Sequence, residues 1–454
     1  MLFVFLILHL ILLINTLFTL WPEMVVYSYL LNNNFLLYRD IINPYPPLLT
    51  YLLSIPTRLF GYHPLSLQIL TWIIIMTCDL LIYVFVKKST QNRFYAFACL
   101  AFFLIISIPL GINGLWFDLV QTPFILASFY FFYKFSKNNQ NIKFLSLSLI
   151  FLIAASLIKQ QALWLFFAYF AILMSESKFR KVAILKEFGI FLLILALINF
   201  AQFLFFWTKG LQKDFVFWTI YFPLIKASSM PGYILLPSVR QLTVVLSLYL
   251  IFLPIIMKKK SLATLVSLPM LAFAYPRFDY FHLIPALSIL SFNVGENLKF
   301  FKLSKFSTKI VVLFALVFLF VFTTKYIRSN RTWQVRFFEQ DIHSAAIFMS
   351  KVTQPDEPIY IQNGPDQILP IAGRLPTKPW ADEFPWYLEI EGLQEKVIQG
   401  VENQNPKYVI FKPYEQKDNY EIGSYRPQIL ANYLDENYRN HFQINESLWL
   451  KIKK

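Results

Sequence analysis

Long apolar runs alternate with short polar segments over the first 325 residues. A membrane-spanning helix needs roughly 20 mostly apolar residues, and the runs that approach this length predict about eleven spans. They lie near residues 2–20, 67–86, 94–112, 119–133, 144–158, 161–175, 188–206, 242–257, 261–275, 281–293 and 310–325. The first run has no basic segment before it and no small-residue cleavage site, so we expect a retained helix rather than a signal peptide.

Lysine and arginine concentrate in alternate loops, which indicates the orientation of the chain. The basic loops lie near residues 87–93, 134–143, 178–186, 258–260 and 299–309. Such loops stay on the cytoplasmic side of the membrane. The remaining loops, which hold most of the acids and the mixed polar clusters, are therefore predicted to face outward, together with the C-terminal tail.

The predicted membrane domain covers residues 1–328 and has two long outer loops, 21–66 and 207–241. Within the first loop, residues 44–61 begin with prolines and end at glycine, which predicts an amphipathic helix in the membrane interface. The second loop combines aromatic residues with a Ser-Ser-Met-Pro-Gly turn at 228–232. This composition is typical of a mobile loop over a site.

From residue 329 the composition becomes that of a soluble domain. The pattern predicts a helix near 335–351, a strand at 358–362, a turn, a helix near 390–402 and a strand at 408–411. Alternation of this kind suggests a small α/β domain. The predicted fold is thus a polytopic α-helical membrane protein with a small extracytoplasmic α/β domain at residues 329–454.

The overall composition agrees with this class. The chain is 57% hydrophobic and 15% charged, with 49 phenylalanines, which is outside the range of soluble domains. Its net charge of +15 comes from short loops that orient helices, so nucleic acid is not an expected partner. Cys78 and Cys99 lie in apolar runs, which gives neither a disulfide framework nor metal-ligand spacing. We therefore expect no cofactor; a divalent metal stays open as an alternative, although the ligand spacing does not support it.

Short polar motifs stand beside the apolar runs on the predicted outer face. They are Trp-Pro-Glu at 21–23, Leu-Tyr-Arg-Asp-Ile at 37–41, Pro-Tyr-Pro-Pro-Leu at 44–48, Gly-Leu-Trp-Phe-Asp at 114–118, Leu-Ile-Lys-Gln-Gln at 157–161 and Tyr-Pro-Arg-Phe-Asp-Tyr-Phe-His at 275–282. Over residues 1–325 this ordered set resembles the GT-C superfamily of integral membrane glycosyltransferases. Within it, the set is most similar to the RgtA/B/C/D-like group, related to protein O-mannosyltransferases and the lipid A aminoarabinose transferase.

The resemblance implies transfer of a sugar from a polyprenyl-phosphate donor at the outer surface of the cell membrane, usually with inversion. The acceptor hydroxyl would belong to a glycan, a lipid or a protein. One departure is visible at the end of the first helix, where several relatives have a pair of acids. Here Pro22 precedes Glu23, so one carboxylate is available at that point.

Sugar transfer from a phosphate needs a general base and groups that offset charge on the departing phosphate. Glu23 is the first candidate for the base, and Asp40 would position the acceptor or share that role. Arg39, Lys159 and Arg277 are candidates for binding the donor phosphate. The substrate-binding candidates are Tyr38, Tyr45, Trp116, Asp118, Gln160, Gln161, Asp279 and His282.

Each candidate also has a structural explanation. Glu23 could be an interfacial acid, Arg39 and Asp40 a surface ion pair, Asp118 a helix cap, and Lys159 a cation that reaches the membrane surface. Two other functions stay open: a transporter or flippase of lipid-linked glycans, and an O-antigen polymerase or ligase. A transporter would place polar groups near the bilayer midplane in repeated halves. Here the charges gather at one predicted face, which favours the enzyme.

Overall fold

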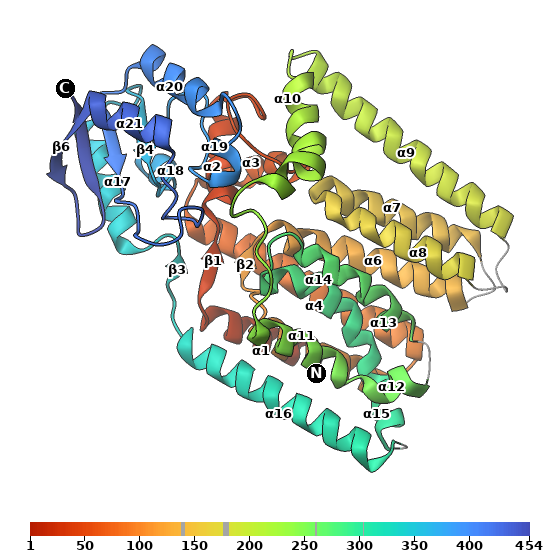
Figure 1. Ribbon diagram of the computed structural model, residues 1–454. Helices are drawn as coiled ribbons and strands as arrows, with labels where there is room; N and C mark the ends of the chain where they lie inside the picture. Colours follow the sequence, from red (N-terminus) through yellow and green to blue (C-terminus); the bar gives the residue numbers. More distant parts are fainter. Residues whose placement is uncertain (138–140, 176–180, 259–260, 303) are drawn as a thin grey trace. The chain divides into compact units, whose positions relative to one another are not determined.

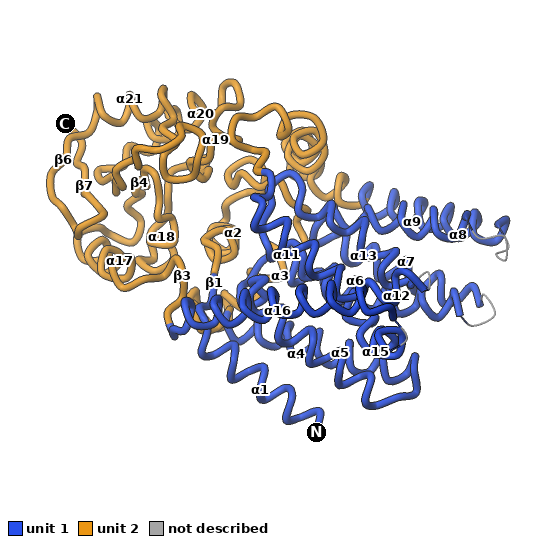
Figure 2. Tube along the Cα trace, turned by 60° about the horizontal axis from the view of Figure 1, so that its bottom comes forward, with its two compact units in different colours: residues 1–19, 68–200, 236–333 blue, residues 20–67, 201–235, 334–454 orange. Residues whose placement is uncertain are grey.

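The protein is described by a computed structural model that covers residues 1–137, 141–175, 181–258, 261–302 and 304–454. Parts of the predicted basic loops around residues 138–140, 176–180, 259–260 and 303 lie outside this description. The described chain divides into two compact units, coloured separately in Figure 2. Unit 1 comprises residues 1–19, 68–200 and 236–333, and unit 2 comprises residues 20–67, 201–235 and 334–454.

Unit 1 is almost entirely helical. Within it, α6 and α7 pack side by side (Figure 1), and α6 also contacts α14. The helices that lie wholly or mostly in this unit are α1 (Leu2–Ile14), α4 (Pro64–Thr90), α5 (Arg93–Ser107), α6 (Phe117–Lys137), α7 (Ile142–Ile158), η1 (Gln160–Leu163), α8 (Trp164–Ser175), α9 (Lys181–Trp207), α11 (Val239–Leu250), α12 (Leu253–Lys258), α13 (Leu262–Ser267), η4 (Pro269–Ala274), η5 (Tyr280–Leu283), α14 (Ile284–Leu290), η6 (Ser291–Asn293), α15 (Val294–Lys302) and α16 (Phe306–Ser329). Two short strands, β1 (Phe18–Leu20) and β2 (Gly114–Leu115), lie between helices.

Among the described residues, three helices are long and apolar enough to cross a membrane. They are α4, α9 and α16, which coincide with the spans predicted at 67–86, 188–206 and 310–325. Other predicted spans fall on shorter apolar helices, such as α1, α5 and α7. The number of membrane crossings therefore stays a prediction.

The spans predicted as continuous between residues 242 and 293 are broken into shorter pieces. New helical segments begin at or next to Pro254, Pro269 and Pro285. Proline lacks the N–H that would extend the preceding helix, but it fits the first positions of a new one. The hydrophobic pattern located these segments correctly, and the prolines divided them.

Unit 2 joins the two predicted outer loops to the C-terminal residues. Its first helices are α2 (Pro22–Asn32) and α3 (Leu48–Phe60). The predicted amphipathic helix is confirmed as α3, which follows two prolines and ends at Gly61 with φ of 79°. Leu49 and Leu53 face the core, whereas Ile55 and Leu59 are exposed. An exposed apolar face of this kind suits a membrane interface.

The second predicted loop is more regular than its sequence suggested. Residues 212–229 form α10 (Gln212–Val216), a π-helical stretch η2 (Phe217–Lys226) and η3 (Ala227–Ser229). Phe215, Trp218 and Phe222 are buried in the unit 2 core. Aromatic packing thus orders a segment that its turn residues predicted to be a loop.

The C-terminal residues form an α/β arrangement around a four-stranded sheet with order β4-β5-β7-β6. The β4 and β5 strands are parallel, and β7 runs antiparallel to both β5 and β6. The elements are β3 (Val335–Arg336), α17 (Gln340–Val352), β4 (Ile359–Gln362), α18 (Ile368–Ala372), α19 (Pro385–Leu388), α20 (Leu393–Gln404), β5 (Tyr408–Phe411), α21 (Gln428–Asn437), β6 (Tyr438–Gln443) and β7 (Trp449–Lys453). In Figure 1, α17, α20 and α21 surround this sheet.

The predicted helices and strands of this region are present as α17, β4, α20 and β5. The predicted turn after β4 holds Asn363 and Gly364 at positive φ. Sequence reasoning missed α21, β6 and β7. Both β6 and β7 contain several charged or polar residues, so their alternation is weak.

The N-terminal and C-terminal parts of unit 2 share one apolar core. Val26 and Leu30 of α2 belong to the same cluster as Val397 of α20 and Val409 of β5. The Tyr29 hydroxyl donates a hydrogen bond to the Arg374 carbonyl at 3.1 Å. A short bridge between Ile41 and Trp380 adds main-chain pairing, in which Trp380 N–H donates to the Asp40 carbonyl at 2.8 Å.

Gly400 in α20 offers a test of this packing. A Cβ at this position would lie 2.1 Å from the Lys378 carbonyl oxygen. Because backbone cannot move aside as a flexible side chain can, we expect Gly400→Ala to destabilise unit 2 by about 1–3 kcal/mol. Thermal unfolding in detergent would measure the change. Gly189→Ala in α9 is the matched control, since no atom lies within 4 Å of its Cβ position; equal effects of the two substitutions would contradict the prediction.

Candidate functional site

Glu23 lies in the first turn of α2, directly after Pro22. Proline suits a helix start, since an N–H there would have no intrahelical acceptor. The residues from Met24 to Leu30 are buried, so the helix enters the unit 2 core at once. The Oε2 atom of Glu23 is buried and has no hydrogen-bond partner among the described residues. Burial, to which the charge of Asp366 adds, raises the pKa of Glu23 to about 7.

Two aspartates of the C-terminal region accompany Glu23. Asp366 follows the turn after β4, and its Oδ1 accepts a hydrogen bond from Trp380 Nε1 at 3.2 Å. Asp382 is 4% exposed and interacts electrostatically with Asp366 and Glu23. Burial raises the pKa of Asp366 to about 6. Burial, with the charges of Glu23 and Asp366, raises the pKa of Asp382 well above its ordinary value, so Asp382 keeps its proton at neutral pH.

Glu23, Asp366 and Asp382 form what we call the carboxyl cluster. Among the described residues, no lysine or arginine forms an ion pair with any of the three. Tyr27 and Tyr387 both interact electrostatically with Glu23 and with Asp382. The cluster is thus a set of acids and phenols in a largely apolar setting, where a carboxyl group holds its proton near neutral pH.

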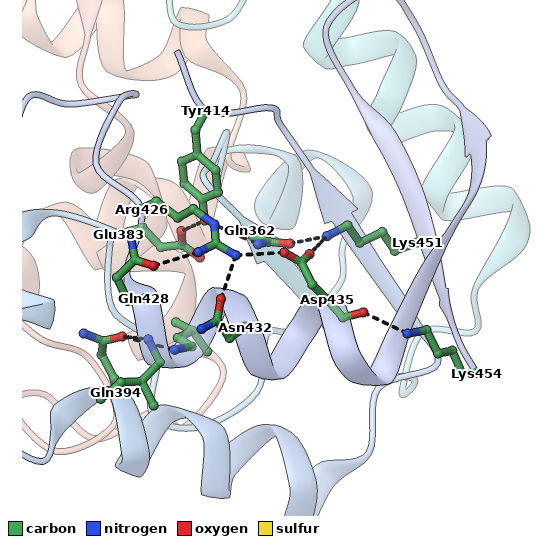
Figure 3. A network of polar contacts seen from close by, with 12 residues as sticks. Gln362, Glu383, Gln394, Tyr414, Arg426, Gln428, Asn432, Asp435, Lys451 and Lys454 are labelled. Carbon is green, nitrogen blue, oxygen red and sulfur yellow. Dashed lines mark hydrogen bonds and ion pairs between the residues drawn. The ribbon is translucent and has the colours of Figure 1, made fainter. Parts of the chain in front are cut away.

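Glu383 follows the cluster in the chain and begins a polar network of the C-terminal region. Its carboxylate accepts hydrogen bonds from Tyr360 at 3.2 Å and from Tyr414 at 2.9 Å. Burial raises the pKa of Glu383 to about 7. Figure 3 shows the network continuing through Gln362 to Lys451, whose Nζ lies 2.7 Å from Asp435 Oδ1. These bonds join β4, β7 and α21 and fix the segment that carries Asp382.

Arg39 and Asp40 do not pair with each other. Arg39 donates to the Gly210 carbonyl at 2.5 Å, and its Nε lies 3.7 Å from Asp214. Asp40 accepts from the Leu36 N–H at 2.9 Å and lies 3.6 Å from Lys378 Nζ. These partners hold the first outer loop against other parts of unit 2. Both residues keep a structural role whether or not they contact a substrate.

Tyr38 and Tyr45 occupy different surroundings, although both were singled out for substrate binding. Tyr38 is fully buried at φ of 75°, and its hydroxyl donates to the Tyr45 carbonyl at 3.0 Å. Its ring contacts Phe206 and Phe215 edge-on, which is the environment of a core residue. Tyr45, in contrast, interacts electrostatically with Tyr27 and Tyr387 beside the carboxyl cluster.

Unit 1 contains a second polar centre, formed by three of the predicted site residues. Asp118 lies in the first turn of α6, Lys159 caps the end of α7, and His282 lies in η5. Asp118 Oδ2 is 2.7 Å from Lys159 Nζ and 2.8 Å from His282 Nδ1. Gln121 Nε2 donates to the other carboxylate oxygen at 3.2 Å. Asp118 and Lys159 are 0% and 3% exposed, so this Asp118 cluster is a buried, hydrogen-bonded group.

The other predicted residues of unit 1 lie on the segments next to this cluster. Gln160 begins η1, and Gln161 Nε2 donates to the Tyr275 carbonyl at 2.8 Å. Asp279 caps η5 by accepting the Tyr280 N–H. Trp116 packs edge-on against Phe281 with ring centroids 5.9 Å apart. Arg277 belongs to the same segment, between η4 and η5.

Sequence reasoning did not find Asp366, Asp382 and Glu383. One signal was present: the acids at 382–383 stand in an aromatic-rich segment that includes Trp380, Phe384 and Trp386. Phenylalanine and tryptophan are largely buried in folded proteins, so acids that stand between them are candidates for burial. Within the described residues, no group of three or more histidine, cysteine, aspartate or glutamate side chains is arranged to hold a metal ion.

Comparisons with known proteins identify the class of this fold. The model of a family described as dolichyl-phosphate-mannose-protein mannosyltransferase matches residues 44–207. No curated protein matches the chain. The crystal structure of ArnT from Cupriavidus metallidurans bound to undecaprenyl phosphate is similar, with a TM-score of 0.63 and 12% identity over 99% of this chain and 97% of that chain.

Two structures from Archaeoglobus fulgidus are also similar. The oligosaccharyltransferase tethered with an acceptor peptide gives a TM-score of 0.53 at 12% identity, over 100% of this chain and 74% of that chain. The oligosaccharyltransferase AglB in complex with an inhibitory peptide and a dolichol-phosphate gives 0.51 at 14% identity, over 97% and 72%. At these identities the likeness is one of fold.

The architecture is that of a polytopic helical membrane protein. More particularly, the chain has the fold of the GT-C superfamily, which confirms the resemblance found in its sequence motifs.

The buried acids of unit 2 predict how stability depends on pH. Glu23, Asp366 and Glu383 have folded-state pKa values raised to about 7, 6 and 7. A raised pKa contributes stability that is present at low pH and is lost as pH rises through the folded-state value. We therefore expect the unfolding temperature of unit 2 to fall between about pH 4.5 and pH 7.

Asp382→Asn should reduce this loss and raise the unfolding temperature at neutral pH by a few degrees, since a neutral amide replaces a buried acid. Differential scanning fluorimetry across pH would measure both effects. Asp356→Asn, at an exposed position, is the control. An unfolding temperature that rises through the same pH range would contradict the assignment.

The Asp118 cluster predicts a strong coupling between two charges. Lys159→Met leaves the buried carboxylate without its cation, which costs about 3–5 kcal/mol of folding free energy. Lys159→Met combined with Asp118→Asn removes both charges and should recover most of that loss. Thermal unfolding of the two variants in lipid nanodiscs provides the measurement. If the double variant is as unstable as the single one, the two charges do not compensate each other.

Proposed function

We propose that the chain is a membrane glycosyltransferase that transfers a sugar from a polyprenyl-phosphate donor to an acceptor hydroxyl at the outer face of the membrane. The acceptor is a glycan, a lipid or a protein. The proposal is supported by the GT-C fold and by the family match over residues 44–207. Neighbours of the same fold were solved with undecaprenyl phosphate and with a dolichol-phosphate, which are carriers of the proposed kind.

The observation that carries the proposal is the environment of Glu23. A general base works best when its pKa lies near the working pH. Burial raises the pKa of Glu23 to about 7, and its Oε2 atom has no hydrogen-bond partner among the described residues. An available, weakly solvated carboxylate is what activation of a hydroxyl requires.

The proposed reaction is a single displacement. The ionised carboxylate of Glu23 accepts the proton of the acceptor hydroxyl while the oxygen attacks the anomeric carbon. The bond from that carbon to the phosphate oxygen breaks, and polyprenyl phosphate leaves with the bonding electrons. Attack opposite the leaving group inverts the configuration at the anomeric carbon.

Other side chains have proposed supporting roles. Arg39, Lys159 and Arg277 are candidates for offsetting charge on the phosphate. Asp40 is the second candidate for the base, although its carboxylate already accepts from the Leu36 N–H. Asp366 acts on Glu23 through its charge and raises its pKa, and Glu23 and Asp366 in turn act on Asp382, so we assign both aspartates a positioning role.

Glu23→Gln tests the base. The amide keeps the shape and cannot accept the proton, so we expect kcat to fall by roughly 10²–10⁴-fold with little change in donor KM. Wild-type kcat should rise with pH and level off above about 7, as Glu23 ionises. Release of polyprenyl phosphate by the purified protein in lipid, measured with a panel of polyprenyl-phosphate sugars, gives both quantities.

Glu391→Gln, at an exposed position of unit 2, is the matched control and should keep wild-type turnover. Normal turnover by Glu23→Gln would move the base to Asp40. If no donor supports release, while a labelled lipid-linked glycan moves between leaflets, the protein is a transporter.

A further inference from the structure

The contact distances within the Asp118 cluster fix the tautomer of His282. Its Nδ1 lies 2.8 Å from Asp118 Oδ2 and 3.3 Å from Lys159 Nζ. If Nδ1 accepted a hydrogen bond from Lys159, its lone pair would lie 2.8 Å from a lone pair of Asp118 Oδ2, and the two would repel each other. A carboxylate oxygen accepts only, so Nδ1 carries hydrogen and donates to Asp118. In the neutral ring Nε2 is then the atom with a lone pair.

The charges of the cluster cancel when His282 is neutral. Lys159 contributes one positive charge and Asp118 one negative charge, and their atoms are 2.7 Å apart. Pulling Lys159 away toward another anion would leave the fully buried Asp118 unpaired, which is a large cost for a buried charge. Lys159 therefore does not provide a net positive charge for a phosphate.

Two further charged side chains, Arg277 and Asp279, lie on the segment that leads to His282. Besides Asp118 and Lys159, Asp279 on the same segment acts on the ring. The adjacent segments η4 and α14 carry no charged side chain. The ring packs against Phe281, with centroids 4.2 Å apart, and the side chain is 12% exposed. The imidazole is thus the one member of the Asp118 cluster whose change of protonation can alter the net charge without breaking a buried ion pair.

We infer that His282 takes up a proton when the Asp118 cluster binds the phosphate of a polyprenyl phosphate, so that the imidazolium supplies the cation that Lys159 cannot. The inference rests on the proposed function, in which the donor phosphate contacts the Asp118 cluster, and it transfers to His282 the positive charge first proposed for Lys159. In the bound state Nδ1–H still donates to Asp118, and Nε2–H donates to a phosphate oxygen. The proton comes from solvent and returns to it when the phosphate lipid leaves.

Proton uptake on binding can be measured directly. Undecaprenyl phosphate is titrated calorimetrically into the full-length protein in nanodiscs, in buffers with different ionisation enthalpies at about pH 7.5, where an ordinary histidine is mostly neutral. We expect an uptake of close to one proton per bound lipid, with affinity falling by up to about tenfold per pH unit above that value.

The variant His282→Gln distinguishes proton uptake by the protein from proton uptake by the lipid phosphate. A phosphate monoester itself titrates near pH 6, and this contribution is common to all variants. Glutamine can still donate to Asp118 but cannot be protonated, so the uptake should fall to the lipid's own small value and the affinity should become nearly independent of pH. His441→Gln, at an exposed position, should behave like the wild type.

Three results would each overturn the inference: no saturable binding of undecaprenyl phosphate, binding by the wild type without proton uptake, or equal uptake by wild type and His282→Gln. The wild-type titration decides even if the variant does not fold. The assay is independent of sugar transfer. Sugar transfer without proton uptake on lipid binding would support the proposed function and contradict this inference. Proton uptake on lipid binding without sugar transfer from any donor would support this inference and contradict the proposed function.

Discussion

The main physical constraint on unit 2 is the burial of one carboxyl group at the start of a helix. Glu23 stands where α2 enters an apolar core, and two further acids, Asp366 and Asp382, lie near it. In the part of the chain that the structure describes, no lysine or arginine forms an ion pair with any of the three. Such an arrangement lowers stability at neutral pH, since each acid would be more easily ionised in the unfolded chain. The protein retains it through the packing of the residues around it. Functional sites commonly contain groups that are energetically unfavourable and that the surrounding structure holds in place.

The two polar centres solve the problem of buried charge differently. In the Asp118 cluster, a lysine offsets the aspartate, and every oxygen of the carboxylate has a donor. In the carboxyl cluster, burial raises the pKa values of the acids, so that protonation rather than a cation removes their charge. The first solution fixes the charges of Asp118 and Lys159 in place, and the second leaves the charges of its acids free to change with pH. Binding of a charged group requires charges that are fixed in place, whereas transfer of a proton requires a group whose charge can change.

The sequence predicted the elements that follow strong periodic patterns and located the polar motifs. Apolar runs found α4, α9 and α16, and alternation found β4 and β5. The motifs also named Asp118, Lys159 and His282, which the structure brings together. Asp366 and Asp382 could not be predicted, because their importance arises from contacts with a helix more than 300 residues earlier in the chain. Local propensity carries no information on such contacts. For the same reason, the aromatic packing that orders residues 212–229 could not be predicted, because the turn residues in this segment indicated a loop.

The shared core of unit 2 has a consequence for how the chain is made. Its parts are residues 20–67, 201–235 and 334–454, so the core cannot close until the last part leaves the ribosome. Until then α2 lacks Val397 and Val409, which belong to the same apolar core as Val26 and Leu30. Long-range contacts of this kind form late and leave apolar surface exposed meanwhile. Premature termination anywhere before β7 would therefore impair the N-terminal helix that carries Glu23, although every residue of that helix had been synthesised.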